Sequence, residues 1–552
     1  MAENISSRRG SLRDAPDALY NPNANLSTHS FNSTESSVDT KKGKYIASEI
    51  GGIVANDSRG SFLSKSLLLC ALVAAISSIN YGWVIGSVNI PALVIEECSG
   101  GPETWSGGFP SCIPMSSTLW GLVVGLTALG AWAGSMYSGK VADWLGRKRT
   151  LIINNVFFVA GALLTCTATS IAQLAVGRFV SGIGCGFAAN IVSTYNSEAA
   201  TTRSRGFLGG FQQLMILVGL FLSQVVSIGL SEAPRWRILF SLSAALAIVQ
   251  TGLLLLIPES PKFLAIKGRY DESRAALQKL RGNLDTTFEY EELIMMLEAG
   301  RRNGAVPKPS LWQVLSGKTD TDLRHLVFCV LFLMLSQQWS GAKGVMFYST
   351  EILSTTFHLS SEEVKHIPSI AQLLTLGIGA IGAVAVVIGM SILDRVGRRT
   401  VLIVSSLATT ICAALIVVGS KLDLGPMVAT FMYVFNLVFQ SGSGFIPYLS
   451  ASELLPYYAL GSISGLATSI NCLTLFIVSF IFPILDKALG SYLFVPFIVT
   501  NFITFLFAVF MMPEAKGKLI SEVISEYQGP PHIVSDCRFL KRRKTEESSD
   551  LQ

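Results

Sequence analysis

Charged residues are scarce in this sequence. Asp, Glu, Lys and Arg make up 14% of its 552 residues, whereas soluble domains carry roughly 25%. The shortage excludes a disordered chain, a coiled coil and an ordinary water-soluble enzyme. The net charge of +5 is too small to indicate nucleic-acid binding. A phosphate-binding loop and a metal-ligand cluster are also missing, so we expect no cofactor and no metal.

Apolar residues, by contrast, make up half of the sequence and recur in long runs. Each run of about 20 residues is long enough to cross the hydrocarbon core of a bilayer. We therefore predict an all-α membrane protein with twelve transmembrane helices. The predicted spans are 66–86, 118–138, 150–169, 173–195, 207–230, 238–257, 324–346, 367–390, 401–419, 427–450, 462–485 and 490–512. The expected domains are a disordered N-terminal tail (1–65), a first six-helix bundle (66–257), a linker with short helices (258–323), a second six-helix bundle (324–512) and a C-terminal tail (513–552).

Lys and Arg are distributed unevenly across the predicted membrane. Of the 42, 35 fall on the side that holds both termini and the linker, five fall on the other side, and Arg178 and Lys343 lie within spans. Because basic residues accumulate on the cytosolic side, this count places both termini in the cytosol. Cys98 and Cys112 share the first loop on the opposite side, where they either form a disulfide or stay as two free thiols.

A motif of acidic and basic residues recurs in the two halves of the chain at a nearly constant separation. It follows spans two, four and six, and again spans eight, ten and twelve. The matching pairs are Asp143 with Asp394, Arg147 with Arg398, Glu198 with Glu453, and Glu259 with Glu514. We interpret these residues as a cytosolic gate whose ion pairs break and re-form. The alternative is that the basic residues only set the topology.

These motifs and their neighbours resemble the sugar porter family of the major facilitator superfamily. The resemblance runs from about residue 66 to 518 and rests on seven stretches in order: GKVADWLGRKR (139–149), GRFVSGIGCGF (177–187), YNSEAATTRSRG (195–206), PESPKFL (258–264), QQWSGAKGVMFYS (337–349), LDRVGRRT (393–400) and PEAKGK (513–518). It implies the major facilitator fold, with two six-helix pseudo-repeat bundles around a solute pathway, and alternating access. It also adds Arg205 to the cytosolic gate.

Polar side chains inside the spans mark the expected pathway. The resemblance implies that four amides contact a sugar, and each amide suits neutral hydroxyls because it offers a donor and an acceptor. Hydrogen bonding between helices is the alternative role. The four amides are Gln213, Gln337, Gln338 and Asn471.

Aromatic residues near these amides have expected roles as well. Phe347 and Tyr348 stand where the resemblance implies an external gate, and Tyr448 stands where the family usually has Trp. A Tyr keeps a stacking face for a sugar ring and adds a hydroxyl. Ordinary packing is the alternative.

The sequence also departs from the family pattern. Lys343 and Gly382 occupy Asn positions, Gln440 occupies a Glu position, and Val84 stands where proton-coupled members carry Asp. A valine cannot take up a proton. We therefore expect facilitated diffusion of a monosaccharide or polyol through a lipid bilayer, with Lys343 and Gln440 among the substrate contacts.

Two alternative functions stay open. One alternative to facilitated diffusion of a neutral sugar is a carrier of an anionic sugar derivative that uses Lys343. The other is a non-transporting nutrient sensor with the same fold. We do not expect an enzyme, because the membrane core shows no nucleophile and base pair. We expect an integral multi-pass protein of either the plasma membrane or the vacuolar membrane.

Overall fold

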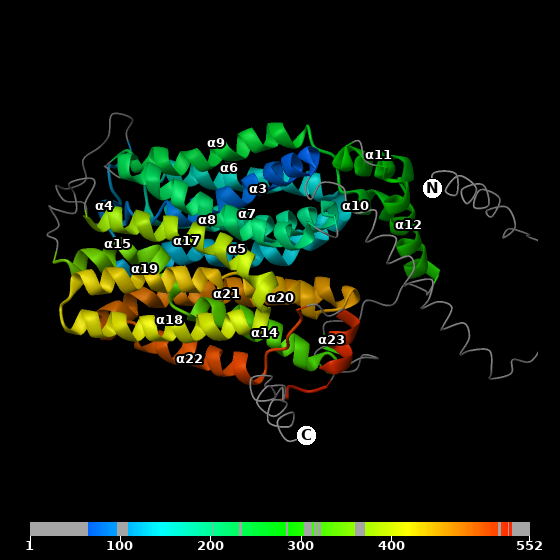
Figure 1. Cartoon of the computed structure of the whole chain (residues 1–552). Coiled ribbons are helices and arrows are strands. Elements are labelled where there is room, and N and C mark those ends of the chain that lie inside the picture. Colours follow the sequence, from blue (N-terminus) through cyan, green and yellow to red (C-terminus); the bar gives the residue numbers. More distant parts are fainter. Residues whose placement is uncertain are drawn as a thin grey trace, which may run out of the picture. The chain divides into compact units, whose positions relative to one another are not determined.

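The computed structural model describes residues 64–96, 109–201, 204–230, 234–282, 285–302, 312–313, 316, 322–358, 370–516, 520–527 and 529–532. Nearly all of this part is α-helical. The helices of the first half are α3 (Lys65–Gly86), α4 (Ala92–Glu96), α5 (Ser117–Leu145), α6 (Arg147–Cys166), α7 (Ile171–Ala199), α8 (Arg205–Leu230) and α9 (Trp236–Leu254). Those of the second half are α14 (Arg324–Trp339), α15 (Ala342–Thr356), α17 (Ile370–Val396), α18 (Arg398–Lys421), α19 (Gly425–Ser441), α20 (Ile446–Leu454), α21 (Tyr457–Leu489) and α22 (Val495–Phe510). Figure 1 shows the two halves packed against each other.

The prediction of an all-α protein with twelve spans is confirmed, because every predicted span falls on a helix or on a broken pair of helices. In the part of the chain that the structure describes, ten helical segments are long and apolar enough to cross a membrane. Span seven is the pair α14 and α15, and span ten is the pair α19 and α20. The first break occurs at Gly341, whose φ of 86° is left-handed. A Cβ there would also collide with the ring of Phe497, so the position requires glycine.

Small residues bring the helices close together. A Cβ on Gly130 of α5 would meet the backbone of α7, and a Cβ on Gly182 of α7 would meet the backbone of α5. Such contacts are the usual way in which membrane helices associate, since lipid offers no hydrophobic drive between them. Between the halves, Gly121 and Gly125 of α5 approach Pro483 and Phe476 of α21.

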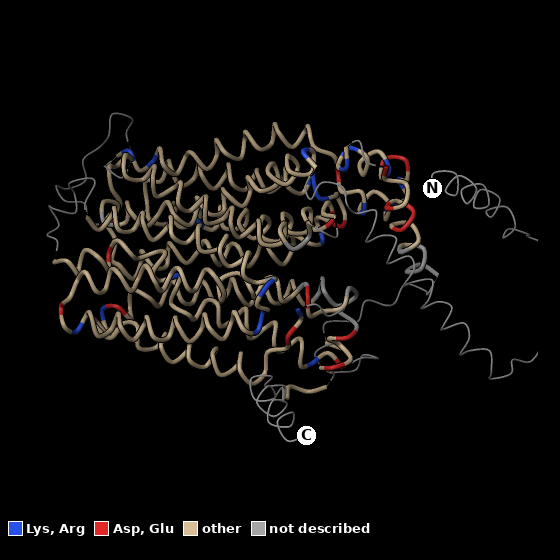
Figure 2. Tube along the Cα trace, viewed as in Figure 1, with Lys and Arg blue, Asp and Glu red and all other residues tan. Residues whose placement is uncertain are grey.

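Short helices follow each half. The linker carries α10 (Pro261–Ile266), α11 (Tyr270–Arg281) and α12 (Thr287–Arg302), and α23 (Ile520–Glu526) follows α22. Arg281 ties α11 to the first half by donating to the carbonyl of Ala199 at 2.8 Å. We call the helix ends near α10–α12 and α23 the terminal side, and the other ends the opposite side. Figure 2 shows that charged residues gather at the helix ends, as expected for membrane-spanning helices.

Candidate functional site

Four of the predicted substrate contacts form one hydrogen-bonded cluster in the second half. Asn471 of α21 donates to the side-chain oxygen of Gln337 at 2.7 Å, and Gln338 donates to Asn471 Oδ1 at 2.8 Å. The hydroxyl of Tyr448 donates to the same Asn471 oxygen at 3.0 Å. Gln337 also donates to the carbonyl of Gly444, in the break between α19 and α20. We call Gln337, Gln338, Tyr448 and Asn471 the amide cluster.

The amide cluster has unused hydrogen-bonding capacity. Gln338 is 2% exposed, and its Oε1 has no hydrogen-bond partner in the described protein. A buried acceptor in that condition costs free energy, so it favours a ligand that offers a donor. Gln213, the predicted contact on α8, is half-buried, and no hydrogen bond among the described residues joins it to the cluster.

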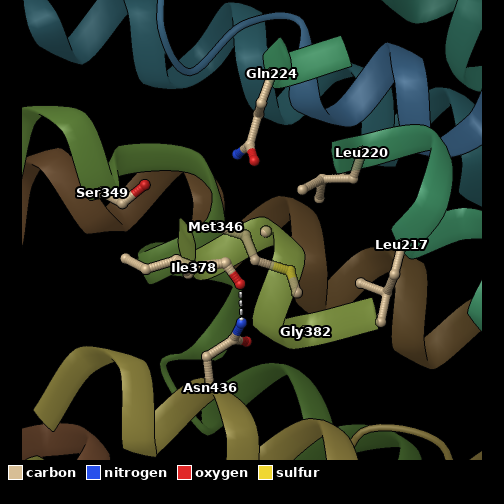
Figure 3. Close-up of a pocket in the computed structure, with 9 residues that line it drawn as sticks. Leu217, Leu220, Gln224, Met346, Ser349, Ile378, Gly382 and Asn436 are labelled. Carbon is tan, nitrogen blue, oxygen red and sulfur yellow. Dashed lines mark hydrogen bonds between the residues drawn. The ribbon is translucent and has the colours of Figure 1, made fainter. Parts of the chain in front are cut away.

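Lys343 and Gln440 meet at a second place, around the sulfur of Met346 on α15. Lys343 Nζ lies 3.8 Å from Met346 Sδ, and Gln440 Nε2 lies 3.9 Å from it. Met346 in turn lines a pocket between α8, α15, α17 and α19, drawn in Figure 3. The structure thus brings the two main departures from the family pattern together beside one pocket.

Two residues in this pocket were missed by the sequence analysis. Gln224 extends from α8 and Asn436 from α19, and the side-chain oxygen of each is buried without a hydrogen-bond partner in the described protein (Figure 3). Asn436 donates to the carbonyl of Ile378 at 2.7 Å. A Cβ on Gly382 would stand 3.0 Å from Asn436 Nδ2. The amide of Asn436 therefore fills space that a side chain at position 382 would need.

The halves are bridged on the opposite side by Asn89, which lies between α3 and α4. Its side chain donates to the carbonyl of Met346 at 2.8 Å and to Ser349 Oγ at 2.9 Å. The backbone amide of Thr350 donates to Asn89 Oδ1 at 3.4 Å. Asn89 was not singled out from the sequence, because it lies in a short connection outside the apolar runs.

The predicted external gate residues lie directly beside this bridge. Tyr348 is buried, stacks on Phe482 with ring centroids 5.0 Å apart, and donates to the carbonyl of Ser479 at 3.0 Å. Phe347 is also buried and lines a separate pocket that faces the first half.

The predicted cytosolic gate of the first half forms a connected set on the terminal side. Arg147 pairs with Glu198 at 2.9 Å and with Asp143 at 3.4 Å. Glu259 accepts from the backbone amides of Arg147 and Lys148, at 2.9 and 3.1 Å. A carboxylate at this helix N-terminus also complements the helix dipole of α6.

The second half repeats this arrangement with more exposed partners. Arg398 pairs with Glu453 at 2.8 Å, and Glu514 accepts from the backbone amides of Arg398 and Arg399, both at 3.2 Å. The Arg147–Glu198 side chains are 7% and 9% exposed, against 13% and 25% for Arg398–Glu453. These pairs join helices within one half.

Three predicted residues cannot be placed. Cys98 and the side chains of Arg205 and Asp394 lie outside the described residues. Cys112 is disulfide-bonded, and its partner is likewise outside them.

The family model described as "Sugar (and other) transporter" matches residues 70–527. The chain is 30% identical over 521 residues to solute carrier family 2, facilitated glucose transporter member 2, of Gallus gallus, with 84% of this chain and 94% of that protein covered. It is 30% identical over 492 residues to facilitated glucose transporter member 4 of Homo sapiens, covering 86% and 92%.

Solved structures with a similar fold include the xylose transporter XylE from E. coli. In its partially occluded inward-open conformation it matches with a TM-score of 0.66 and 22% identity, covering 82% of this chain and all of that one. XylE bound to 6-bromo-6-deoxy-D-glucose, a structure whose title calls it a proton:xylose symporter, matches with a TM-score of 0.67 and 23% identity, covering 84% and 99%.

Proposed function

This chain belongs to the sugar transporter family of the major facilitator superfamily, and on that premise we propose that it carries a hexose-like monosaccharide or a polyol by facilitated diffusion. The observation that carries the proposal is the amide cluster. It gathers neutral donors and acceptors from the broken spans seven and ten and from α21. Neutral amides suit hydroxyl groups because they can both donate and accept hydrogen bonds.

Alternating access is supported by where the polar contacts lie. On the opposite side, Asn89 joins the first half to α15 of the second half. On the terminal side, the Arg147 and Arg398 ion pairs each stay within one half. We infer that this arrangement is a carrier closed on the opposite side, and that the terminal side faces the cytosol.

Transport without proton coupling is the second part of the proposal. Helix α3 contains no acidic residue along Lys65–Gly86. Position 84 is valine, and its backbone carbonyl accepts from Arg178 Nη1 at 2.8 Å. Without a carboxylate here, the first half offers no group on α3 that could load and release a proton with the solute.

An anionic sugar derivative is the alternative substrate, because Lys343 contributes a cation beside the pocket of Figure 3. Under this alternative the ammonium group pairs with a carboxylate on the solute. Under the leading proposal it donates to a neutral hydroxyl. The two differ in which solutes compete for transport.

The test uses the full chain reconstituted in vesicles. Radiolabelled hexoses, pentoses, polyols and sugar acids are supplied as a panel, with a pH-sensitive dye inside the vesicles. We expect neutral sugars to equilibrate across the membrane, with no change when a protonophore is added. Internal acidification upon addition of substrate outside the vesicles would contradict uncoupled transport, because a symporter carries protons inward with the solute. Preference for sugar acids would favour the alternative substrate, and no uptake of any solute in the panel would contradict the proposed function.

A further inference from the structure

A second small pocket lies where α3, α5 and α7 of the first half face α15 and α21 of the second half. Arg178 of α7 and Thr127 of α5 supply polar groups to its wall, beside Tyr81 of α3. Phe347 of α15 and Leu475 of α21 close it from the second half. This pocket is distinct from the amide cluster and from the pocket of Figure 3.

Arg178 is a cation without a carboxylate partner in this wall. Its side chain is almost fully buried, since the residue is 3% exposed. One nitrogen, Nη1, donates to the Val84 carbonyl, whereas Nε and Nη2 have no hydrogen-bond partner in the described protein. The residues that line the pocket include no Asp and no Glu.

Thr127 adds a second unused group at the same place. Its hydroxyl is buried and also has no hydrogen-bond partner in the described protein. A threonine in a helix usually satisfies its hydroxyl by donating to a carbonyl three or four residues earlier. Thr165 of α6 does so, with bonds to Gly161 and Ala162 at 2.9 and 3.0 Å. Thr127 keeps its hydroxyl free instead, in the pocket that Arg178 lines.

Other buried arginines of the first half show what is unusual here. Arg147 has two carboxylates within ion-pair distance. Arg237 donates to the carbonyls of Cys166 and Pro110 and lies 4.3 Å from the ring of Trp236. A buried charge that lacks such compensation is unfavourable, so these groups favour a partner of opposite charge.

We propose that Arg178 and Thr127 form a binding site for one small inorganic anion of halide size. The guanidinium supplies charge and N–H donors, and the hydroxyl supplies one further donor. The pocket that both residues line has room for a group about as large as a water molecule, so a sugar ring or a phosphate is too large. Chloride from solution fits this chemistry.

The anion has a structural consequence for the contact between the halves. Its donors belong to the first half, whereas Phe347 and Leu475 pack over the pocket from the second half. Neutralising Arg178 removes the cost of covering a bare cation with these apolar side chains. The anion therefore stabilises the arrangement in which the halves are closed around α15.

Thermal unfolding of the purified full chain tests this site. Chloride is titrated at constant ionic strength against sulfate, which is too large for the pocket. We expect a saturable rise in the midpoint with chloride and bromide and none with sulfate, because a ligand that binds the folded state raises stability by mass action. A rise that is linear and follows general salt effects would overturn the proposal.

Matched variants locate the effect. Thr127→Val should raise the half-saturating chloride concentration about two- to tenfold, the range for a lost hydrogen bond. Thr165→Val, a buried threonine whose hydroxyl bonds within its own helix, should leave it unchanged. Arg178→Gln should abolish saturation. If Arg178→Gln fails to fold, the two threonine variants still decide, since equal chloride responses in both would overturn the assignment.

Competition separates an inorganic anion from a substrate carboxylate. Glucuronate and gluconate are added at a fixed chloride concentration near half-saturation. We expect no change in the chloride-dependent rise, because the pocket excludes a sugar. Displacement of chloride by either sugar acid would overturn the proposal and assign Arg178 to the transported solute. The readout is binding, so it does not depend on whether any sugar is transported.

Discussion

Removal of the Asn89 bridge offers the sharpest test of how the two halves open. Asn89→Ala deletes the two bonds that the side chain donates, to the Met346 carbonyl and to Ser349, at 2.8 and 2.9 Å. It also deletes the acceptor for the amide of Thr350. All three partners lie on α15, in the other half of the protein. The substitution should therefore destabilise closure on the opposite side.

The magnitude follows from the two donated bonds. Each neutral hydrogen bond contributes about 0.5–1.5 kcal/mol net, so the pair contributes about 1–3 kcal/mol to the closed state. If the bonds are absent when the opposite side is open, the ratio of open to closed molecules rises about 5- to 150-fold. The longer bond from Thr350 is left out of this estimate.

A matched control is available on the preceding helix. Asn80 of α3 is as buried as Asn89, at 0% against 2% exposed. It donates to the Ser243 carbonyl at 3.0 Å and accepts from the Ser243 hydroxyl at 2.6 Å. Both groups belong to Ser243 of α9, in the same half of the protein. Asn80→Ala should thus cost comparable stability without changing the balance between open and closed states.

Distances between spin labels on the opposite side provide the assay. Thr169 follows α6 and Leu422 follows α18, and both are exposed. We expect the distance distribution of Asn89→Ala to gain a longer component that Asn80→Ala lacks. The same distribution for both variants, with or without a change from wild type, would refute the bridge as a determinant of opening.

Three further substitutions test the site and the gate. Gln338→Leu should weaken sugar affinity about two- to tenfold in equilibrium binding, whereas Gln250→Leu, on a buried amide bonded within the first half, should leave affinity unchanged; equal affinities would make the amide cluster structural. Arg147→Met and Arg398→Met should both slow transport. The thermal unfolding midpoint should fall further for Arg147→Met, because its partner Glu198 is more buried than Glu453, the partner of Arg398. Unchanged turnover in both variants would mean that these arginines only set the membrane topology. In uptake assays, Lys343→Asn should make neutral hexoses stronger competitors of transport relative to sugar acids. An unaltered set of competing solutes would mean that the ammonium group does not contact the substrate.

Sequence patterns predicted the membrane helices well because each span is determined by the hydropathy of consecutive residues. Span boundaries and helix ends agree within a few residues for α3, α8 and α9. The breaks in spans seven and ten coincide with Gly341 and Gly442, and Gly341 has the left-handed backbone that such a break needs. These features depend on local residues, which a sequence displays directly.

Contacts between distant helices were harder to predict, since they depend on how the helices pack. The Gln337–Asn471 hydrogen bond joins α14 to α21, and family resemblance, not spacing, pointed to both residues. Asn436 filling the space beside Gly382 could not be foreseen. The two residues lie on different helices, so only the packing of α17 and α19 shows that the Asn436 amide lies beside Gly382. The free hydroxyl of Thr127 was missed for the same reason.

The placement of the candidate contacts suggests that the two halves have different roles in binding and in movement. The amide cluster, Lys343 and Gln440 all belong to the second half, whereas Gln213 and Gln224 come from α8 of the first half. A solute held mainly by one half can remain bound while the other half moves past it.

Helix α8 also packs against α17, with the Gln224 oxygen directed at Gly379, so a change at this contact would reach the site. We therefore expect substitutions in the amide cluster to alter affinity, and a side chain at Gly379 to alter the transport rate by displacing the Gln224 amide at the contact between α8 and α17. A Gly379→Ala variant with weakened sugar binding and unaltered turnover would contradict these different roles.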